Sequence, residues 1–185
     1  MSPKRKPYVI AIAAVAGGGK TTITKRLNKL ISNSTAIYFD DYDFEESPDD
    51  ICKWIENGGD PNEWVLTPLI EDLRLLLSKN SYNYIFLDFP FAYQHKKMSS
   101  MIDYTIFINT PLDIAMARRI QRDFNKYDDV KNEMGNYLNR GRKAYLHMLE
   151  TIRPDSDYIV DGKLSIESIT DLIIEKIDNN RKEVN

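Results

Sequence analysis

Cysteine and histidine are scarce in this chain. Its 185 residues include one cysteine, Cys52, and two histidines, His95 and His147. A single cysteine cannot form a disulfide within the chain or supply a cysteine metal site, and the two histidines lack ligand spacing. We therefore exclude disulfide scaffolds and cysteine-zinc modules, and we expect both histidines on the surface.

Long apolar runs and a strong net charge are missing as well. No apolar run approaches membrane-spanning length, and no signal peptide precedes the first apolar segment. The net charge of −3 does not favour general binding to nucleic acid. Apolar residues at 42% suffice for the core of a single domain over residues 1–185. We expect a cytoplasmic monomer or homodimer that binds neither membranes nor nucleic acid.

A glycine-rich segment follows the first apolar run. It reads Ala14-Val-Ala-Gly-Gly-Gly-Lys-Thr21, after the apolar run Tyr8–Val15 and before a helical pattern that starts near Lys20. This order of strand, glycine turn and helix is typical of the phosphate-binding P-loop, with Ala14 in place of the first glycine. Backbone N–H groups of such a turn and of the helix N-terminus surround phosphate oxygens. We expect nucleotide phosphates to contact Ala16, Gly17, Gly18, Gly19, Lys20, Thr21 and Thr22.

Apolar runs of strand length alternate with helical patterns along the chain. Strands are expected at residues 8–15, 36–39, 84–87, 104–108 and 158–160. The alternation predicts an α/β, three-layer P-loop NTPase fold with a five-stranded parallel sheet, helices on both faces and a small helical lid at about residues 118–142. Residues 124–136 lack a clean period, and the tail 178–185 is expected to fray. Buried helical stripes are expected at Leu138, Tyr145, Leu149 and Ile152, and at Ile166, Ile169, Ile173 and Ile177.

Carboxylates follow the second and third expected strands, and ligands of parallel sheets bind at the carboxyl ends of strands. Asp88 and the Thr21 hydroxyl are candidate Mg²⁺ ligands, although Asp88 could instead cap the turn at Phe89-Pro90. Asp40 and Asp41 are adjacent, so their side chains diverge and only one readily faces the nucleotide. Asp40 is a candidate proton acceptor for an attacking hydroxyl and a third candidate metal ligand; a solvated acidic loop is the alternative.

Three arginines lie close together on one predicted helix. Arg118 and Arg122 share a face and Arg119 lies one position round. Guanidinium groups bind phosphate oxygens and neutralise the charge that develops during transfer. We expect Arg118 and Arg122, with Lys20 and Asp40, to be catalytic and Arg119 to bind nucleotide; surface ion pairs with Asp123 or Asp128 are the alternative.

Aromatic residues gather near these loops. Those that follow strand ends could stack on a flat ring, although core packing is the alternative for any single one. They are Tyr42, Phe44, Phe91 and Tyr93.

These motifs resemble the uridine kinase and nicotinamide riboside kinase group of P-loop kinases over roughly residues 8–165. Ala14–Thr22 is similar to the group's Gly-x-x-x-Ser-Gly-Lys-Thr-Thr, with Gly18 in place of Ser. Phe39-Asp-Asp-Tyr-Asp-Phe44 resembles its Gln-Asp-Asp/Ser-Phe-Tyr/Phe, and Ala117–Asp123 resembles its Arg-Arg-Ile-x-Arg-Asp. The resemblance implies that Asp40 is the catalytic base and that the arginines enter a lid. Asp88 stands where the group has Glu, and Asp88-Phe-Pro replaces Glu-Gly-x.

The combined expectation is an ATP- and Mg²⁺-dependent kinase. It would move the γ-phosphoryl group to a hydroxyl of a small molecule, most readily a nucleoside-like one. By analogy with the fold, adenine would rest between the lid arginines and the turn at Gly162. Two alternatives remain open: another alcohol, such as pantothenate, a sugar acid or a coenzyme precursor, or a P-loop ATPase or nucleotide switch without an acceptor.

Overall fold

The computed structural model describes residues 6–183, and a parallel sheet forms their centre. Its strands run in the order β2-β3-β1-β4-β5, and every pair of neighbours is parallel. The expected five-stranded parallel sheet is thereby confirmed, while residues 1–5 and 184–185 of the expected domain lie outside the described residues. The strands are β1 (Tyr8–Ala13), β2 (Ser34–Tyr38), β3 (Tyr84–Asp88), β4 (Tyr104–Asn109) and β5 (Tyr158–Asp161).

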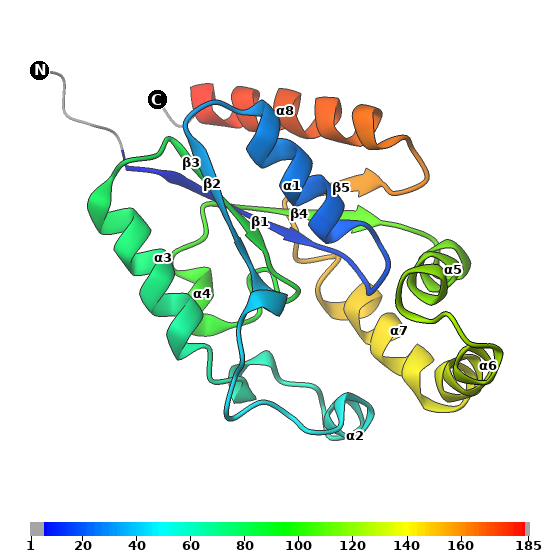
Figure 1. Cartoon of the computed structure of the whole chain (residues 1–185). Helices are drawn as coiled ribbons and strands as arrows, with labels where there is room; N and C mark the ends of the chain where they lie inside the picture. The colour runs from blue at the N-terminus through cyan, green and yellow to red at the C-terminus, as the bar shows by residue number, and fades with distance from the viewer. Residues whose placement is uncertain (1–5, 184–185) are drawn as a thin grey trace, which may run out of the picture.

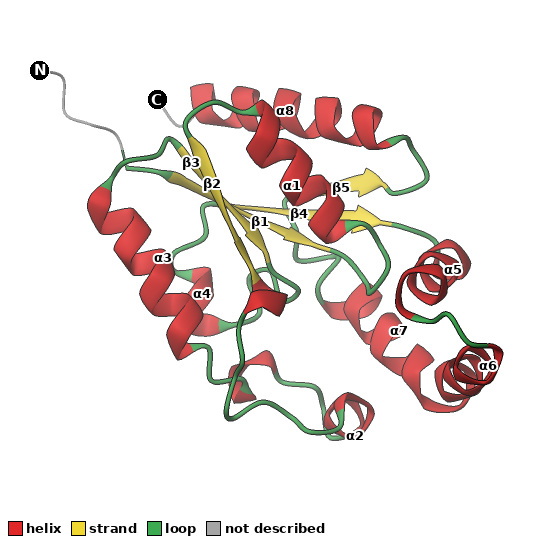
Figure 2. Cartoon of the chain, viewed as in Figure 1, coloured by secondary structure: helices red, strands yellow, loops and turns green. Residues whose placement is uncertain are grey.

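Helices cover both faces of the sheet (Figures 1 and 2). One face packs against α1 (Lys20–Leu30) and α8 (Ile166–Glu183). The other packs against α3 (Thr67–Lys79) and α4 (Lys96–Ser99), and nearer the carboxyl ends of β1 and β4 against α5 and α7. The remaining elements are α2 (Ile51–Glu56), α5 (Leu112–Asp123), α6 (Tyr127–Asn136), a π-helical turn (Tyr137–Gly141), α7 (Arg142–Thr151) and short 3-10 turns at Phe39–Asp41 and Pro61–Glu63.

The central strand explains why the strands are apolar on both sides. Val9 and Ala11 of β1 belong to the core beneath α3, whereas Ile10 and Ile12 belong to the core beneath α1 and α8. All four side chains are fully buried. Strands covered on both faces lack the polar alternation of a half-exposed strand, as this sequence does.

Residues 127–136 form α6, within the segment expected to be a helical lid, and this helix has no buried residue. Some local expectations were wrong: Leu138 is 72% exposed. The π turn after α6 has more residues per turn than an α-helix, so Leu138 falls out of line with the buried Tyr145 and Ile152 of the next helix. Ile166 is 43% exposed at the start of α8, although Ile169, Ile173 and Ile177 are buried as expected. The same helix continues to Glu183 where fraying was expected.

No helix within residues 6–183 is both long and apolar enough to cross a membrane. His95 also departs from expectation, because it is only 2% exposed. Its ring contacts the Trp64 carbonyl oxygen at 3.1 Å and accepts the Met98 N–H. Burial lowers the pKa of His95, which favours the neutral form of the ring. This histidine fixes Trp64, which lines the cleft described next.

Candidate active site at the carboxyl ends of the strands

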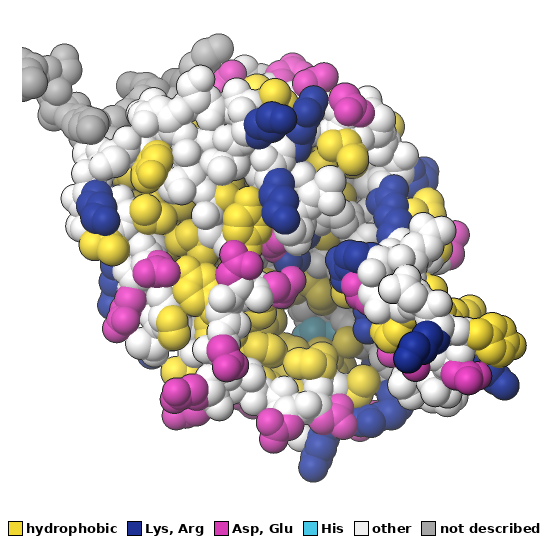
Figure 3. Space-filling model, viewed as in Figure 1, with side chains coloured by type: hydrophobic (Ala, Val, Ile, Leu, Met, Phe, Trp, Pro, Cys, Tyr) yellow, Lys and Arg dark blue, Asp and Glu magenta, His cyan; other side chains and the backbone are white. Residues whose placement is uncertain are grey.

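A cleft of about 670 Å³ lies at the carboxyl ends of the strands. Figure 3 shows it as a hollow with a histidine side chain inside. Its walls come from the glycine-rich loop, the segments after β2 and β3, α5, α7 and the turn before α8. The cleft brings together most of the predicted site residues, namely Ala16, Gly17, Gly18, Gly19, Lys20, Thr21, Thr22, Asp40, Arg118, Arg122 and Gly162. Asp88 and Arg119 do not line it.

The backbone of the loop depends on glycine. Gly17 and Gly19 have φ values of +78° and +100°, in the left-handed region that favours glycine. A Cβ at Gly17 would also overlap the Ala115 carbonyl oxygen. Gly19 precedes α1, whose first turn has no side-chain cap. The N–H groups of that turn are therefore available to a phosphate.

Thr110 supports the loop from the end of β4, a role that was not predicted. Its hydroxyl donates a 2.8 Å hydrogen bond to the Gly18 carbonyl oxygen. Gly162 packs directly on Thr110, because a Cβ at Gly162 would overlap the Thr110 side chain. Gly162 thus connects the turn after β5 to the glycine-rich loop through one threonine.

Replacement of Gly17 by alanine should weaken nucleotide binding. The new Cβ would force the loop away from α5, and the positive φ would be strained as well. We expect Gly17→Ala to weaken ATP binding at least about tenfold, because the backbone N–H groups of the loop would no longer point at the phosphate oxygens. Titration of ATP by calorimetry measures this.

Gly135→Ala is the matched control, because a Cβ at Gly135 meets nothing within 4 Å and the residue lies in α6. This variant should bind ATP normally. Equal ATP affinity in Gly17→Ala and Gly135→Ala would contradict a phosphate-binding role for the loop.

Asp88 is a buried carboxylate with one charged partner. Its side chain is 1% exposed, and Oδ1 contacts the Lys20 ammonium. Oδ2 is buried and has no hydrogen-bond partner. The Lys20 ammonium therefore already contacts one oxygen of the Asp88 carboxylate. The second oxygen, Oδ2, remains available, so Asp88 is suited to bind Mg²⁺. Residues 6–183 hold no group of three acidic, histidine or cysteine side chains that could bind a metal.

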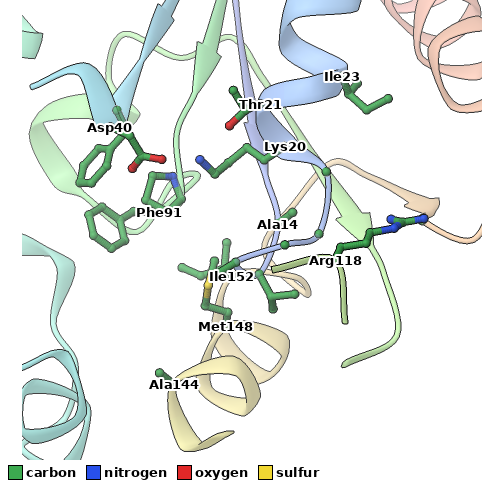
Figure 4. A pocket seen from close by; sticks show the side chains of 18 of the residues that line it. Ala14, Lys20, Thr21, Ile23, Asp40, Phe91, Arg118, Ala144, Met148 and Ile152 are labelled. Atoms are coloured by element: carbon green, nitrogen blue, oxygen red, sulfur yellow. The ribbon is translucent and has the colours of Figure 1, made fainter. Parts of the chain in front are cut away.

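The two aspartates after β2 diverge, as their adjacency predicts. Asp40 lines the main cleft, whereas Asp41 lines a separate cavity of about 250 Å³ beside Tyr42 and Asp72. Figure 4 shows the Asp40 carboxylate pointing toward the Lys20 ammonium, with Thr21 close by. Asp40 is thus the member of the pair that faces the expected phosphate position.

The three arginines have different surroundings. Arg118 and Arg122 line the cleft. Figure 4 shows the Arg118 side chain directed away from Lys20 and Asp40. Arg122 forms 2.6 and 2.9 Å hydrogen bonds with Asp123, which raise the pKa of its guanidinium. Arg119 is held by Glu133 at 2.6 Å and by the Tyr145 hydroxyl at 3.3 Å. Contacts with Asp123, the alternative considered above, thus exist beside the cleft.

One wall of the cleft was not predicted from the sequence. Phe91 is the only one of the four stacking candidates that lines the cleft within the described chain, since Phe44 is buried, Tyr42 donates to Asp72 and Tyr93 donates to Asp157. Helix α7 faces the aromatic side chains. The residues missed are Phe39, Ile51, Trp54, Ile55, Pro61, Trp64, Pro90, Ala144, His147, Met148 and Ile152. The number of aromatic residues between positions 39 and 64 was the sequence feature that could have indicated this wall.

Comparison with known proteins defines the class of this chain. No family model matches it. The uridine kinase of Leuconostoc citreum is 26% identical over 183 residues, covering 84% of this chain and 87% of the relative. The uridine kinase of Borrelia duttonii is 24% identical over 176 residues, covering 82% and 85%. A gluconokinase structure from Sinorhizobium meliloti superposes with a TM-score of 0.57 at 13% identity, covering 97% of each chain, and shares the fold.

The chain is an ATP-dependent kinase of a small molecule with the P-loop fold. The two relatives reported by sequence are uridine kinases, and the cleft lies at the carboxyl ends of the strands, where parallel sheets bind ligands. The resemblance stated from the motifs is confirmed.

Proposed function

We propose that the protein transfers the γ-phosphoryl group of ATP, with Mg²⁺, to a hydroxyl of a nucleoside-like molecule. The observation that carries this proposal is the shared cleft, in which Asp40 and Lys20 face one another beside an aromatic wall. Similarity to uridine kinases supports a nucleoside acceptor. A phosphate-binding loop alone would equally serve a nucleotide switch, but a switch needs no room for an acceptor beside that loop.

In the proposed mechanism, residues 16–22 hold the phosphate chain through backbone N–H groups and Lys20. Thr21 and Asp88 would hold Mg²⁺, with Asp40 as a further candidate ligand; the ion neutralises charge on the phosphate oxygens when bound. Asp40 orients the acceptor hydroxyl and takes its proton as the oxygen attacks phosphorus. Lys20 also contacts the Asp88 carboxylate, so the proposed metal ligand lies beside the proposed phosphate-binding cation.

The arginines and the neighbouring helices would close the site. We propose that residues 118–142 form a lid, which fits the absence of buried residues in α6 and in the π turn. Arg122 lines the cleft and would neutralise the transferring group. Arg118 and Gly162 border the part of the cleft proposed for adenine, with Arg119 as a further lid residue that would have to leave Glu133 to reach nucleotide. Closure excludes water and limits wasted hydrolysis.

A turnover assay tests the proposal. ATP consumption with Mg²⁺ is measured alone and with a panel of nucleosides, and products are identified by mass. We expect one or more nucleosides to stimulate turnover and to gain one phosphoryl group. Hydrolysis that is indifferent to every acceptor would instead identify a nucleotide switch.

A further inference from the structure

A second hollow lies away from the active-site cleft, at the outer edge of the sheet. It is the cavity of about 250 Å³ that Asp41 lines, and it shares no lining residue with the cleft. We call it the β2–α3 groove, because its walls come from β2, from the residues directly after β2 and from α3. Its polar and aromatic lining is Tyr38, Asp41, Tyr42 and Asp72, and its main apolar lining is Leu75 and Leu76.

Strand β2 presents a backbone edge beside this groove. It stands at one end of the strand order, and within the described chain it pairs only with β3 (Figure 1). The backbone N–H and C=O groups of its outer side can therefore pair with a further strand. Proteins often protect such an edge with lysine or proline, but Ser34–Tyr38 reads Ser-Thr-Ala-Ile-Tyr and contains neither.

Two carboxylates give the groove a negative charge. Asp41 comes from the end of β2 and Asp72 from α3, and no basic side chain lines the groove. Neither carboxylate forms an ion pair within residues 6–183. The Tyr42 hydroxyl donates a 2.8 Å hydrogen bond to Oδ2 of Asp72, which holds this carboxylate in place. Burial and that hydrogen bond raise the pKa of Tyr42, so its hydroxyl remains a donor.

The chain around the groove is strongly acidic. Positions 39 to 73 contain twelve acidic residues and one basic residue, Lys53, whereas the whole chain has a net charge of only −3. Figure 3 shows exposed hydrophobic side chains between β2 and α3, with acidic side chains beside them. Charge of one sign that is concentrated in this way attracts ligands of the opposite sign.

Aromatic and apolar surfaces complete the groove. The Tyr42 ring stacks on Phe44 at 5.9 Å and 17° between ring planes, so its orientation is supported from within the protein. Leu75 is 50% exposed. The Lys25 ammonium lies 5.7 Å from the centre of the Tyr38 ring, so this ring already attracts one cation. Such a lining suits a side chain that combines an apolar stem with a flat cationic end.

We propose that the β2–α3 groove binds an arginine side chain of a partner protein, whose extended segment pairs with the edge of β2. The stem of the arginine would lie on Leu75 and Leu76, and its guanidinium would reach Asp41 and Asp72 beside the tyrosine rings. Lysine matches less well, because its ammonium is compact, strongly hydrated and not flat. The groove is also smaller than the roughly 300–1,000 Å³ that whole small molecules occupy, so a single side chain fits it better.

Two peptides that differ by one charge test the inference. The probe is acetyl-Thr-Val-Thr-Arg-Thr-Val-Thr-amide, whose residues favour an extended backbone, and its partner carries citrulline, an uncharged analogue of arginine. Binding is measured by NMR titration of the isotopically labelled protein. We expect the arginine peptide to shift amide signals of β2 and α3 and to bind about five- to tenfold more tightly than the citrulline peptide, as two exposed ion pairs would give. This preference should shrink at high salt.

Asp72→Asn tests the contribution of the carboxylate. Asparagine can still accept the Tyr42 hydroxyl, so the groove keeps its shape while the charge is lost. We expect the preference for arginine over citrulline to fall to about two- to threefold. Glu71→Gln is the matched control, because it removes one negative charge from an exposed position of α3 outside the groove and should keep the full preference.

Leu75→Ala tests the contact with the stem. Arginine and citrulline have the same stem, so this variant should weaken both peptides alike, by about twofold. Leu30→Ala changes a leucine of α1 that is 47% exposed and lies outside the groove, and it should affect neither peptide.

Four results would overturn the inference. They are equal affinities of the two peptides, an undiminished preference for arginine in Asp72→Asn, amide shifts confined to other parts of the protein, and no binding at millimolar peptide. The proposed kinase function would stand in each case, because no turnover is measured and the groove shares no lining residue with the cleft.

Discussion

Asp40→Asn should nearly abolish phosphoryl transfer and leave ATP binding intact. Asparagine keeps the size and polarity of the side chain but cannot take the proton of the acceptor hydroxyl. We expect kcat to fall about 10²- to 10⁴-fold, the usual contribution of a positioned base. ATP affinity, measured by calorimetry, should stay within about twofold of the wild-type value, because residues 16–22 are proposed to bind the phosphates.

Asp41→Asn provides a control one residue away. Asp41 faces the second cavity beside Asp72 and not the main cleft. The local sequence and the loss of one negative charge are matched, so any difference between the variants reports the direction of the side chain. Wild-type turnover in Asp40→Asn, or an equal loss in Asp41→Asn, would refute the assignment of Asp40 as the base.

The choice between Asp40 and Asp41 also illustrates what the sequence can predict. Adjacent side chains at a strand end must diverge, so a single useful carboxylate was foreseeable. The glycine-rich loop was foreseeable too, because its strand, its glycines and its helix are consecutive in the chain. The rule that ligands bind at the carboxyl ends of parallel strands predicts Asp40 and Lys20 at one edge of the sheet.

Contacts between distant segments were not foreseeable. Arg119 contacts Glu133 and Tyr145, and these two partners come from two later helices. Leu138 was placed in the core because the π turn, which changes the helical register, has no clear sequence signal. Single-sequence periodicity describes one helix at a time and carries no information about its neighbours.

The aromatic wall of the cleft was hard to predict for two reasons: its residues are distant in sequence, and each could equally belong to an ordinary core. The walls of this part of the cleft come from the 3-10 turn after β2, from α2, from the segment after β3 and from α7, which lie far apart in sequence. Aromatic side chains in those segments looked equally suited to an ordinary core. Indeed, Phe39 and Phe91 belong to the core and line the cleft at once. Only the tertiary arrangement distinguishes a core aromatic residue from one at the edge of a cavity.

Lys20→Met should lose both activity and stability, for separate reasons. Loss of the cation proposed at the transferring phosphate should lower kcat about 10²- to 10³-fold, as removal of one group that stabilises transition-state charge does. In the ligand-free protein the variant also leaves the Asp88 carboxylate, only 1% exposed, without its counter-charge. Breaking one side of a buried ion pair costs about 3–5 kcal/mol of unfolding free energy. Urea unfolding without ligand measures that loss.

A second substitution separates the two effects. In Lys20→Met/Asp88→Asn the buried charge is gone, so most of the lost stability should return, whereas turnover should stay as low as in Lys20→Met or fall further. Lys25→Met, which lies on the same helix and rests over the Tyr38 ring at 5.7 Å, controls for the loss of a lysine from α1. If Lys20→Met proved as stable as Lys25→Met, the Lys20–Asp88 pair would contribute nothing to the free energy of unfolding, and the stability part of this prediction would be wrong.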